Sequence, residues 1–169
     1  MALSLECRKE KRALIAFGAN LANPRAMYGQ AIAALDKRGF VQFGASPLYR
    51  SPAWPLGSEA PDYLNAMLIG EWAGSAESLL ETLLSVETQL GRTRAEPNAP
   101  RTVDLDLIDF GGQVIDSPSL TLPHPRMADR AFVLLPLRDV APAYVHPDGR
   151  SIDALLAGLD TRHTRVVGG

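Results

Sequence analysis

Residues 91–110 read GRTRAEPNAPRTVDLDLIDF, and the second half of this stretch decides the fold that the chain is expected to adopt. From Thr102 to Phe110, acidic and apolar residues alternate, which is typical of a β-strand because successive side chains point to opposite faces. Asp104 and Asp106 should therefore share one surface. The apolar residues expected to face a core are Val103, Leu105 and Leu107. The two glycines at 111 and 112 then predict a turn.

The residues before this strand predict a regular succession of strands and helices. In chain order these are a strand at 12–17, a helix at 24–38, extended segments at 40–49 and 63–72, and a helix at 76–90. Asn23 followed by Pro24 is typical of a helix start, and Ser75 is expected to cap the second helix. The buried side of that helix is expected to carry Leu79, Leu80, Leu83, Leu84, Val86 and Leu90. This order predicts an α+β, ferredoxin-like βαββαβ core, in which an antiparallel sheet has helices packed on one face.

The rest of the chain is expected to extend this core without adding a second one. Residues 113–115 predict an extra edge strand, residues 123–130 a loop with a short helical turn, and residue 131 the start of a C-terminal helix. A further small helical segment follows residue 149. Because 169 residues with 46% hydrophobic content suit one buried core, residues 1–169 are expected to form a single domain. Residues 1–11 and 162–169 are expected to be flexible ends.

Composition excludes several classes of protein. The formal net charge of −2 gives no general attraction for nucleic acid, so an anionic ligand would need a local basic cluster. The single Cys7 cannot form an internal disulfide, and no Cys/His spacing resembles a zinc site. No apolar run is long enough for a signal peptide or a membrane span. A cytoplasmic, soluble monomer that binds neither membrane nor nucleic acid is expected.

The arginines and aspartates of the opening stretch indicate polyphosphate chemistry. Two carboxylates on one surface suit magnesium, which is commonly held by one or two carboxylates together with substrate phosphates. Arg92, Arg94 and Arg101 add guanidinium groups that match phosphate oxygens and stay charged at any working pH. The alternative is a solvated sheet face with surface ion pairs of little energetic weight. By itself the Asp-x-Asp motif leaves both interpretations open.

Several separated segments resemble one family. In order they are Phe17–Leu21 (FGANL), Tyr49–Pro52 (YRSP), Pro61–Ala66 (PDYLNA), Gly91–Arg94 (GRTR), Pro100–Asp106 (PRTVDLD), Leu120–Met127 (LTLPHPRM) and Arg130–Phe132 (RAF). Together they make the chain similar to 6-hydroxymethyl-7,8-dihydropterin pyrophosphokinase of folate biosynthesis. The resemblance implies transfer of pyrophosphate from ATP to the hydroxymethyl group of the pterin. In that reaction the hydroxymethyl oxygen attacks the β-phosphorus and AMP leaves.

The resemblance also implies roles for individual residues. Two magnesium ions would bind Asp104 and Asp106, which together with Arg92 and Arg101 form the expected catalytic set. The residues implied in ATP binding are Arg92, Arg94, Thr121, His124 and Arg130. The residues implied in pterin binding are Ser51, Pro52, Tyr63, Asn65 and Phe132, with Tyr63 and Phe132 stacking on the ring and Asn65 bonding to its polar edge. Glu87 is given a supporting role.

The chain departs from the family pattern in two places. Residues 95–100 lack a lysine and a tryptophan that some members carry there, and Pro125 replaces an aromatic residue. Trp54 is a candidate to cover the closed site in their place. These differences leave open a paralogue that binds pterin or nucleotide without transferring pyrophosphate. An RNA-binding ferredoxin-like module is a third possibility, although it would call for a basic surface and stacking aromatics on the sheet.

Overall fold

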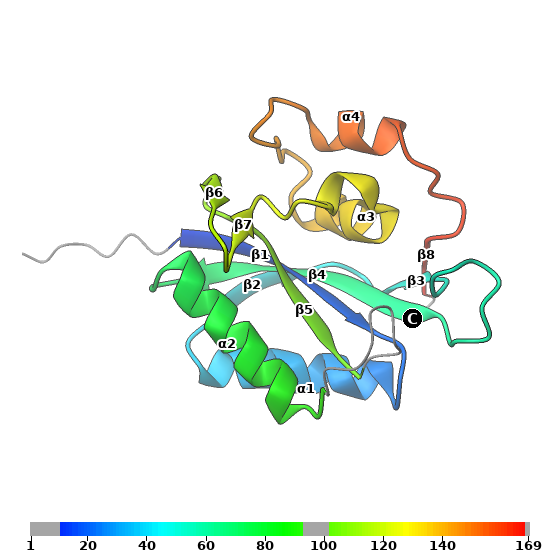
Figure 1. Ribbon diagram of the computed structural model, residues 1–169, viewed down its shortest axis with the longest axis horizontal. Helices are drawn as coiled ribbons and strands as arrows, with labels where there is room; N and C mark the ends of the chain where they lie inside the picture. Colours follow the sequence, from blue (N-terminus) through cyan, green and yellow to red (C-terminus); the bar gives the residue numbers. More distant parts are fainter. Residues whose placement is uncertain (1–10, 93–101, 168–169) are drawn as a thin grey trace, which may run out of the picture.

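An antiparallel sheet forms the middle layer of the computed structural model, which describes residues 11–92 and 102–167 (Figure 1). Its strands are β1 (Lys11–Ala19), β2 (Val41–Ala45), β3 (Tyr49–Ser51), β4 (Tyr63–Trp72), β5 (Asp104–Phe110) and β8 (Arg165–Val166). The order across the sheet is β5-β1-β4-β3-β8, and β2 also pairs with β4. The predicted ferredoxin-like arrangement is confirmed, since β1 lies between β5 and β4.

The second strand of the core is divided in two. The extended run expected at 40–49 forms β2 and β3, which pair with different parts of β4. Ser46 bridges the break, because its N–H donates to the carbonyl of Met67 at 2.9 Å and its hydroxyl accepts the N–H of Met67, also at 2.9 Å. Pro47 follows and has no N–H for a ladder. The division leaves Ser51 at the end of β3 opposite Tyr63.

Helices α1 (Pro24–Lys37) and α2 (Ala76–Gln89) cover one face of the sheet. Both predicted starts are confirmed, since the Asn23 side chain accepts the N–H of Ala26 and the Ser75 side chain accepts the N–H of Ser78. The buried residues of α2 are Ala76, Leu79, Leu83, Val86 and Glu87. Leu84, predicted on the buried side, is instead 39% exposed, because it lies about 100° around the helix from Leu83.

The two helices of the core pack on one face as expected, and the C-terminal helices, whose position was not predicted, cover the opposite face. Helices α3 (Ala131–Val140) and α4 (Ile152–Ala157) pack there against Leu14, Met67 and Ile69 (Figure 1). The reason lies in β1, whose apolar run places Ile15 and Phe17 toward α1 and α2 and Leu14 toward α3. A strand that is apolar on both sides must be buried on both faces.

The remaining elements lie beside this core. Strands β6 (Ile115–Asp116) and β7 (Thr121–Leu122) form a separate two-stranded sheet, so the strand expected at 113–115 does not extend the main sheet. The predicted helical turn is present as η1 (Met127–Asp129). Residues 165–166, within the expected flexible end, pair with β3 as β8. No helix in the described ranges is both long and apolar enough to cross a membrane.

Candidate active site

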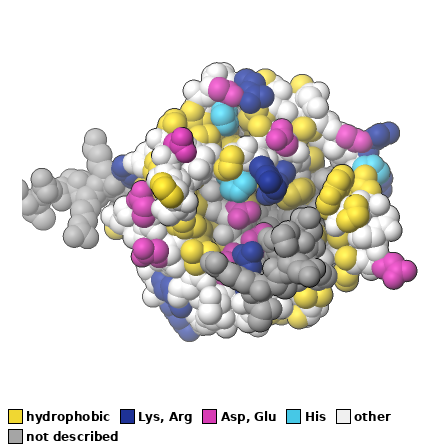
Figure 2. Space-filling model, viewed as in Figure 1, with side chains coloured by type: hydrophobic (Ala, Val, Ile, Leu, Met, Phe, Trp, Pro, Cys, Tyr) yellow, Lys and Arg dark blue, Asp and Glu magenta, His cyan; other side chains and the backbone are white. Residues whose placement is uncertain are grey.

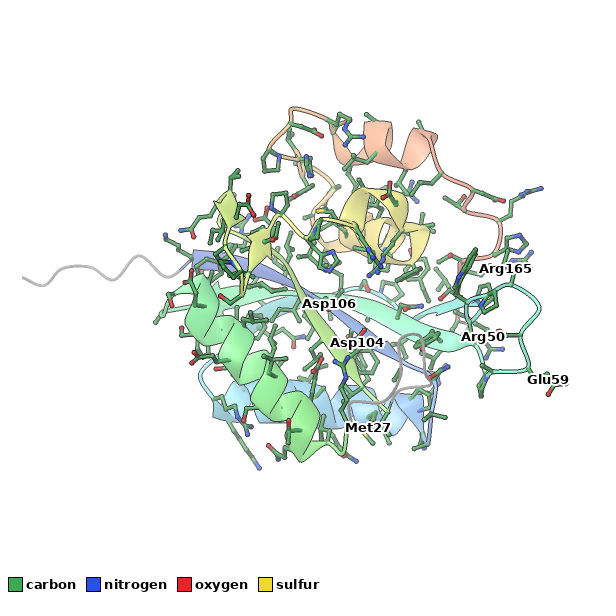
Figure 3. The ribbon with its side chains drawn as sticks, viewed as in Figure 1. Met27, Arg50, Glu59, Asp104, Asp106 and Arg165 are labelled. Carbon is green, nitrogen blue, oxygen red and sulfur yellow. The ribbon has the colours of Figure 1, made fainter. Side chains whose placement is uncertain are left out.

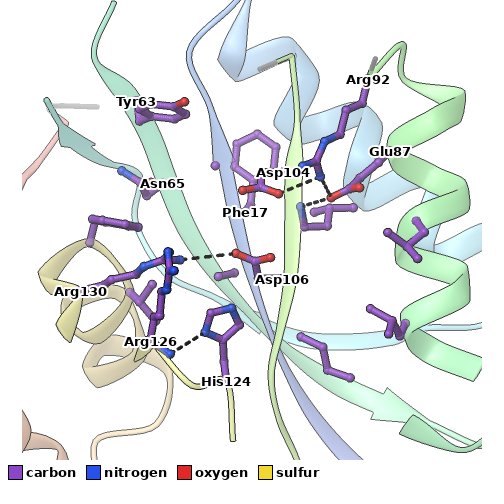
Figure 4. A pocket seen from close by; sticks show the side chains of 18 of the residues that line it. Phe17, Tyr63, Asn65, Glu87, Arg92, Asp104, Asp106, His124, Arg126 and Arg130 are labelled. Carbon is purple, nitrogen blue, oxygen red and sulfur yellow. Dashed lines mark hydrogen bonds and ion pairs between the residues drawn. The ribbon is translucent and has the colours of Figure 1, made fainter. Parts of the chain in front are cut away.

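A pocket of 770 Å³ lies on the α3 side of the sheet, between the end of α2 and the start of α3 (Figure 4). This volume falls in the range that small-molecule sites commonly have. Acidic, basic and histidine side chains gather near the centre of the molecular surface that Figure 2 shows. The pocket is therefore a polar site built on a rigid sheet.

Three adjacent strands supply the floor. Gly18 of β1 pairs with Asp104 on one side and with Asn65 on the other, so these three residues form one row across the sheet. In the next row Ala16 pairs with Asp106 and with Met67. Because paired residues of antiparallel strands point to the same face, Asp104, Asp106 and Asn65 all face the pocket.

The predicted orientation of the two aspartates is confirmed. Leu105 and Leu107 are 3% and 4% exposed and belong to the core under α1 and α2. The side chains of Asp104 and Asp106, on the other face of β5, are 23% and 34% exposed. Figure 3 shows them on the same stretch of β5. Two carboxylates thus open side by side into the pocket.

Arg92 and Glu87 form the wall next to Asp104. The Arg92 Nη1 atom lies 2.9 Å from Asp104 Oδ1 and 2.6 Å from Glu87 Oε1. Glu87 is 3% exposed and also accepts the N–H of Leu105 at 2.8 Å. Burial raises the pKa of Glu87, and the Leu105 N–H and the charge of Arg92 oppose that shift. Glu87 therefore holds both the strand that carries the aspartates and the arginine that faces them.

The opposite wall comes from the segment between β7 and α3. Arg130 Nη1 lies 3.9 Å from Asp106 Oδ2, and its guanidinium lies 5.6 Å from the centre of the Phe132 ring. Burial and the charge of Arg130 lower the pKa of His124. His124 Nδ1 accepts the N–H of Arg126 at 3.2 Å, so the neutral ring carries its proton on Nε2. Thr121 of β7 also lines the pocket.

The end of the pocket near β3 has a different character. Asn65 is 4% exposed and donates through Nδ2 to the Ser51 hydroxyl at 2.8 Å, which fixes the orientation of its amide. Pro52, Tyr63 and Phe132 line the same pocket. Gly18 leaves space between these groups and Asp104, since an added Cβ would lie 3.4 Å from Asn65 Oδ1. An aromatic-lined space with one fixed amide suits a flat, polar-edged ring.

The pocket fits a divalent metal held partly by a substrate. In the described ranges, no group of three or more His, Cys, Asp or Glu side chains is placed to enclose an ion. The two aspartates offer hard oxygen ligands and would leave the other coordination positions to phosphate and water, as magnesium prefers. Their residual exposure keeps them accessible from the pocket.

The structure brings together most of the predicted site residues. Those that line one pocket are Ser51, Pro52, Tyr63, Asn65, Arg92, Asp104, Asp106, Thr121, His124, Arg130 and Phe132. Arg94 and Arg101 lie outside the described residues. The sequence-based set omitted Gly18, which belongs to β1 rather than to a following loop, and Arg126. The alternation of β1 could have placed Gly18 on the pocket face, and the spacing from His124 could have suggested Arg126.

Comparisons with known proteins agree on one family. The family model described as 7,8-dihydro-6-hydroxymethylpterin-pyrophosphokinase (HPPK) matches residues 14–142. The chain is 40% identical over 149 residues to a 2-amino-4-hydroxy-6-hydroxymethyldihydropteridine pyrophosphokinase of Pseudomonas aeruginosa, covering 87% of this chain and 91% of the relative. A protein of the same name from Methylorubrum extorquens is 35% identical over 151 residues, with 88% and 94% covered.

Solved structures of HPPK-DHPS proteins have the same fold. The Plasmodium falciparum HPPK-DHPS variant A437G with pteroate gives a TM-score of 0.69 at 13% identity, covering 90% of this chain and 43% of that one. A further HPPK-DHPS structure, in complex with substrates, gives a TM-score of 0.70 at 11% identity, covering 93% of this chain and 46% of that one. The chain thus spans less than half of these solved chains, and the likeness concerns the fold alone.

Proposed function

Because the chain belongs to the 7,8-dihydro-6-hydroxymethylpterin-pyrophosphokinase family, we propose that the pocket between α2 and α3 is its active site. The protein is a pyrophosphokinase that transfers pyrophosphate from ATP to the hydroxymethyl group of 6-hydroxymethyl-7,8-dihydropterin in folate biosynthesis. The observation that supports the assignment of the site is the row Asp104, Gly18 and Asn65, which sets the carboxylate proposed to bind metal beside the amide proposed to bind the ring.

Asp104 and Asp106 hold the metal in this proposal. A bound divalent ion neutralises phosphate charge and orients the transferring group. The family's ATP chemistry uses a divalent metal, and we propose two magnesium ions because two adjacent carboxylates leave room for phosphate and water. When Asp104 turns to a cation, Arg92 keeps Glu87 as a partner at 2.6 Å, so its guanidinium stays positioned for a phosphate oxygen.

The arginines and His124 bind the triphosphate. Phosphoryl transfer needs alignment and charge stabilisation more than a protein nucleophile. Arg92 and Arg130 flank the aspartates from opposite walls, while the His124 Nε2–H donates to a phosphate oxygen. We assign Thr121, Arg94 and Arg101 to the same anion from the sequence resemblance. The hydroxymethyl oxygen then attacks the β-phosphorus. The bond between the β-phosphorus and the oxygen that bridges it to the α-phosphorus breaks, and AMP leaves with that oxygen.

The pterin occupies the end of the pocket near β3. Tyr63 and Phe132 stack on its ring, and Asn65 bonds to its polar edge. Ser51 holds the Asn65 amide through the 2.8 Å hydrogen bond, so that Oδ1 remains available to the ligand. Pro52 closes the side of this space. The hydroxymethyl group then projects along the floor toward the aspartates.

We further propose a monomer that forms a single domain, acts in the cytosol and binds no nucleic acid. The slightly acidic net charge of −2 and the single cysteine support these assignments. Size-exclusion chromatography with light scattering would test the monomer. A dimer mass would overturn that part of the proposal and leave the assignment of the site intact.

The function is tested by AMP release from ATP, magnesium and 6-hydroxymethyl-7,8-dihydropterin. Wild type should release AMP only when the pterin is present. The double variant Asp104→Asn, Asp106→Asn should lose turnover by roughly 10³-fold or more, because metal binding is removed. Asp36→Asn, on the exposed side of α1, is the matched control and should keep full activity. If the double variant turned over as fast as wild type, the active site would not be at these two aspartates.

A further inference from the structure

Arg126 lies in the pocket on a segment fixed to the free edge of β5. The N–H of His124 donates to the carbonyl of Ile108 at 2.9 Å, and the N–H of Arg126 donates to His124 Nδ1 at 3.2 Å. Both side chains line the pocket, and they lie next to each other in Figure 4. The position of Arg126 therefore follows from main-chain pairing with the strand that carries the aspartates.

The charge of Arg126 has no carboxylate partner among the residues that the structure describes. Arg92 contacts two carboxylates, and Arg130 contacts Asp106 and the Phe132 ring. Arg126 makes no ion pair with any carboxylate in the ranges 11–92 and 102–167, and its side chain is exposed. An incoming anion can therefore bind its guanidinium without displacing any carboxylate of the described ranges. A guanidinium is also the donor best matched to a phosphate.

The pocket has a direction, and Arg126 lies at one end of it. Tyr63 is at the opposite end, Asn65 and Asp104 follow level with each other, and Asp106 lies between them and His124 (Figure 4). Asn65 lies in the row of Asp104, whereas His124 is bonded to Ile108, four residues further along β5. At about 3.3 Å per residue these rows are roughly 13 Å apart. Asn65 thus lies level with Asp104, whereas the segment of His124 and Arg126 is bonded to β5 beyond Asp106.

From this direction, and resting on the proposed function, we infer that Arg126 binds the α-phosphate of ATP, the group that leaves as AMP. In transfer to the β-phosphorus, the attacking and leaving oxygens are roughly in line on opposite sides of the phosphorus. The attacking hydroxyl comes from the pterin end. The leaving α-phosphate must then face the His124–Arg126 end, where Arg126 neutralises the charge that develops as the bond breaks.

The test compares the binding of AMP with that of adenosine, which lacks only the phosphate. Isothermal titration of Arg126→Gln should show about tenfold weaker AMP binding with adenosine binding unchanged, as expected for one charge-assisted contact. Arg126→Lys keeps the positive charge but loses the forked guanidinium. Its affinity for AMP should lie between those of Arg126→Gln and wild type. Arg138→Gln is the matched control, since Arg138 is an exposed arginine of α3 that does not line the pocket. It should bind both ligands as wild type does.

Three results would overturn the inference. Unchanged AMP affinity in Arg126→Gln would show that the guanidinium does not contact the α-phosphate. An equal loss of AMP and adenosine affinity would point to adenine or to altered packing instead, as would wild type that binds both ligands equally. Pterin-dependent AMP release by the same wild-type preparation separates these results from failure of the proposed function, because binding and turnover are measured independently.

Discussion

The carboxylate of Glu87 accepts the main-chain N–H of Leu105 at 2.8 Å, so a buried side chain of α2 closes the free edge of β5. The same Oε1 atom lies 2.6 Å from Arg92 Nη1. An edge strand normally leaves its N–H groups to solvent or to another strand. Here the strand that presents the aspartates is fixed to the helix that positions an arginine, which couples the rigidity of the fold to the geometry of the site.

Replacing Glu87 by alanine should destabilise the protein strongly. The change would leave the Leu105 N–H without its acceptor and Arg92 without its buried partner, and breaking a buried pair costs about 3–5 kcal/mol. Glu87→Gln keeps an acceptor for the Leu105 N–H, so its free energy of unfolding should fall less than that of Glu87→Ala. Urea denaturation measures both. Glu81→Ala, at an exposed position of the same helix, is the control. A Glu87→Ala variant as stable as that control would contradict this account.

The sequence predicts this site unevenly, for physical reasons. Alternation placed Asp104 and Asp106 on one face, and local cap signals located Asn23 and Ser75, because these features depend on near neighbours alone. The Glu87 contact with Leu105 and the Asn65 contact with Ser51 join residues 18 and 14 positions apart. Such contacts depend on strand register and helix packing, which no local pattern encodes. The resemblance supplied their approximate roles without their partners.

The placement of the helices likewise depends on residues far apart in the sequence. The apolar residues of β1 were sufficient to predict a buried strand, but they did not show which face of the sheet the expected C-terminal helices would cover. A continuous apolar run is compatible with burial on one face or two, and the covering residues of α3 lie more than a hundred positions later. The start of α3 lines the pocket through Phe132 and Val133.

A larger residue in place of Gly18 should allow the protein to fold but should weaken its binding of the pterin. Its φ is not positive, and an added Cβ would lie 3.4 Å from Asn65 Oδ1 and 4.0 Å from Tyr63 Cδ1, which the fold can accommodate. A larger side chain would occupy the floor that we assign to the pterin. Gly18→Val is therefore expected to fold and to lose pterin affinity by roughly 100-fold, as steric exclusion from a packed site costs several kcal/mol.

Circular dichroism and titration with the pterin check this prediction. Gly29→Ala on α1 is a suitable control, because no atom lies within 4 Å of an added Cβ and helical alanine is favoured over glycine. Normal pterin binding by Gly18→Val would show that the ring does not lie above Gly18. Loss of folding would show that the strand needs glycine for packing.

Ser51→Ala should weaken pterin binding without changing the chemical step. The variant removes the acceptor of the Asn65 Nδ2 group, and a buried unpaired donor costs about 1–3 kcal/mol. The amide would then be free to turn away from the ligand. Steady-state kinetics should show KM for the pterin rising about tenfold, with KM for ATP and kcat near wild type. A change confined to KM for ATP would place Ser51 beside the nucleotide instead.

Tyr49 should make stability depend on pH under alkaline conditions. Its hydroxyl donates to Asp139 at the end of α3, and burial together with that carboxylate raises its pKa to about 12. Because the folded pKa exceeds the ordinary value of 10.0, the contribution is complete below pH 10 and is lost as pH rises toward 12. The difference in unfolding free energy between wild type and Tyr49→Phe should therefore be about 1–2 kcal/mol at pH 8 and shrink above pH 10. A pH-independent difference, measured by urea denaturation, would contradict this assignment.

Trp54 offers a test of how the pocket closes. It is 69% exposed yet lines the pocket, in the loop between β3 and β4. A large exposed indole beside a site gains apolar contact if it covers bound ligand, so its emission should shift to the blue when ATP and pterin bind. Trp72 is the second tryptophan, held by a 2.9 Å bond to Ser78, and Trp72→Phe isolates the Trp54 signal.

Trp54→Ala should then weaken the binding of both substrates about tenfold while leaving the unfolding midpoint unchanged, since an exposed side chain contributes little to the core. Leu56→Ala, at another exposed apolar position of the same loop that does not line the pocket, is the matched control. If the emission of Trp54 stays constant on ligand addition, and its removal leaves affinity and turnover as they were, the indole takes no part in covering the site.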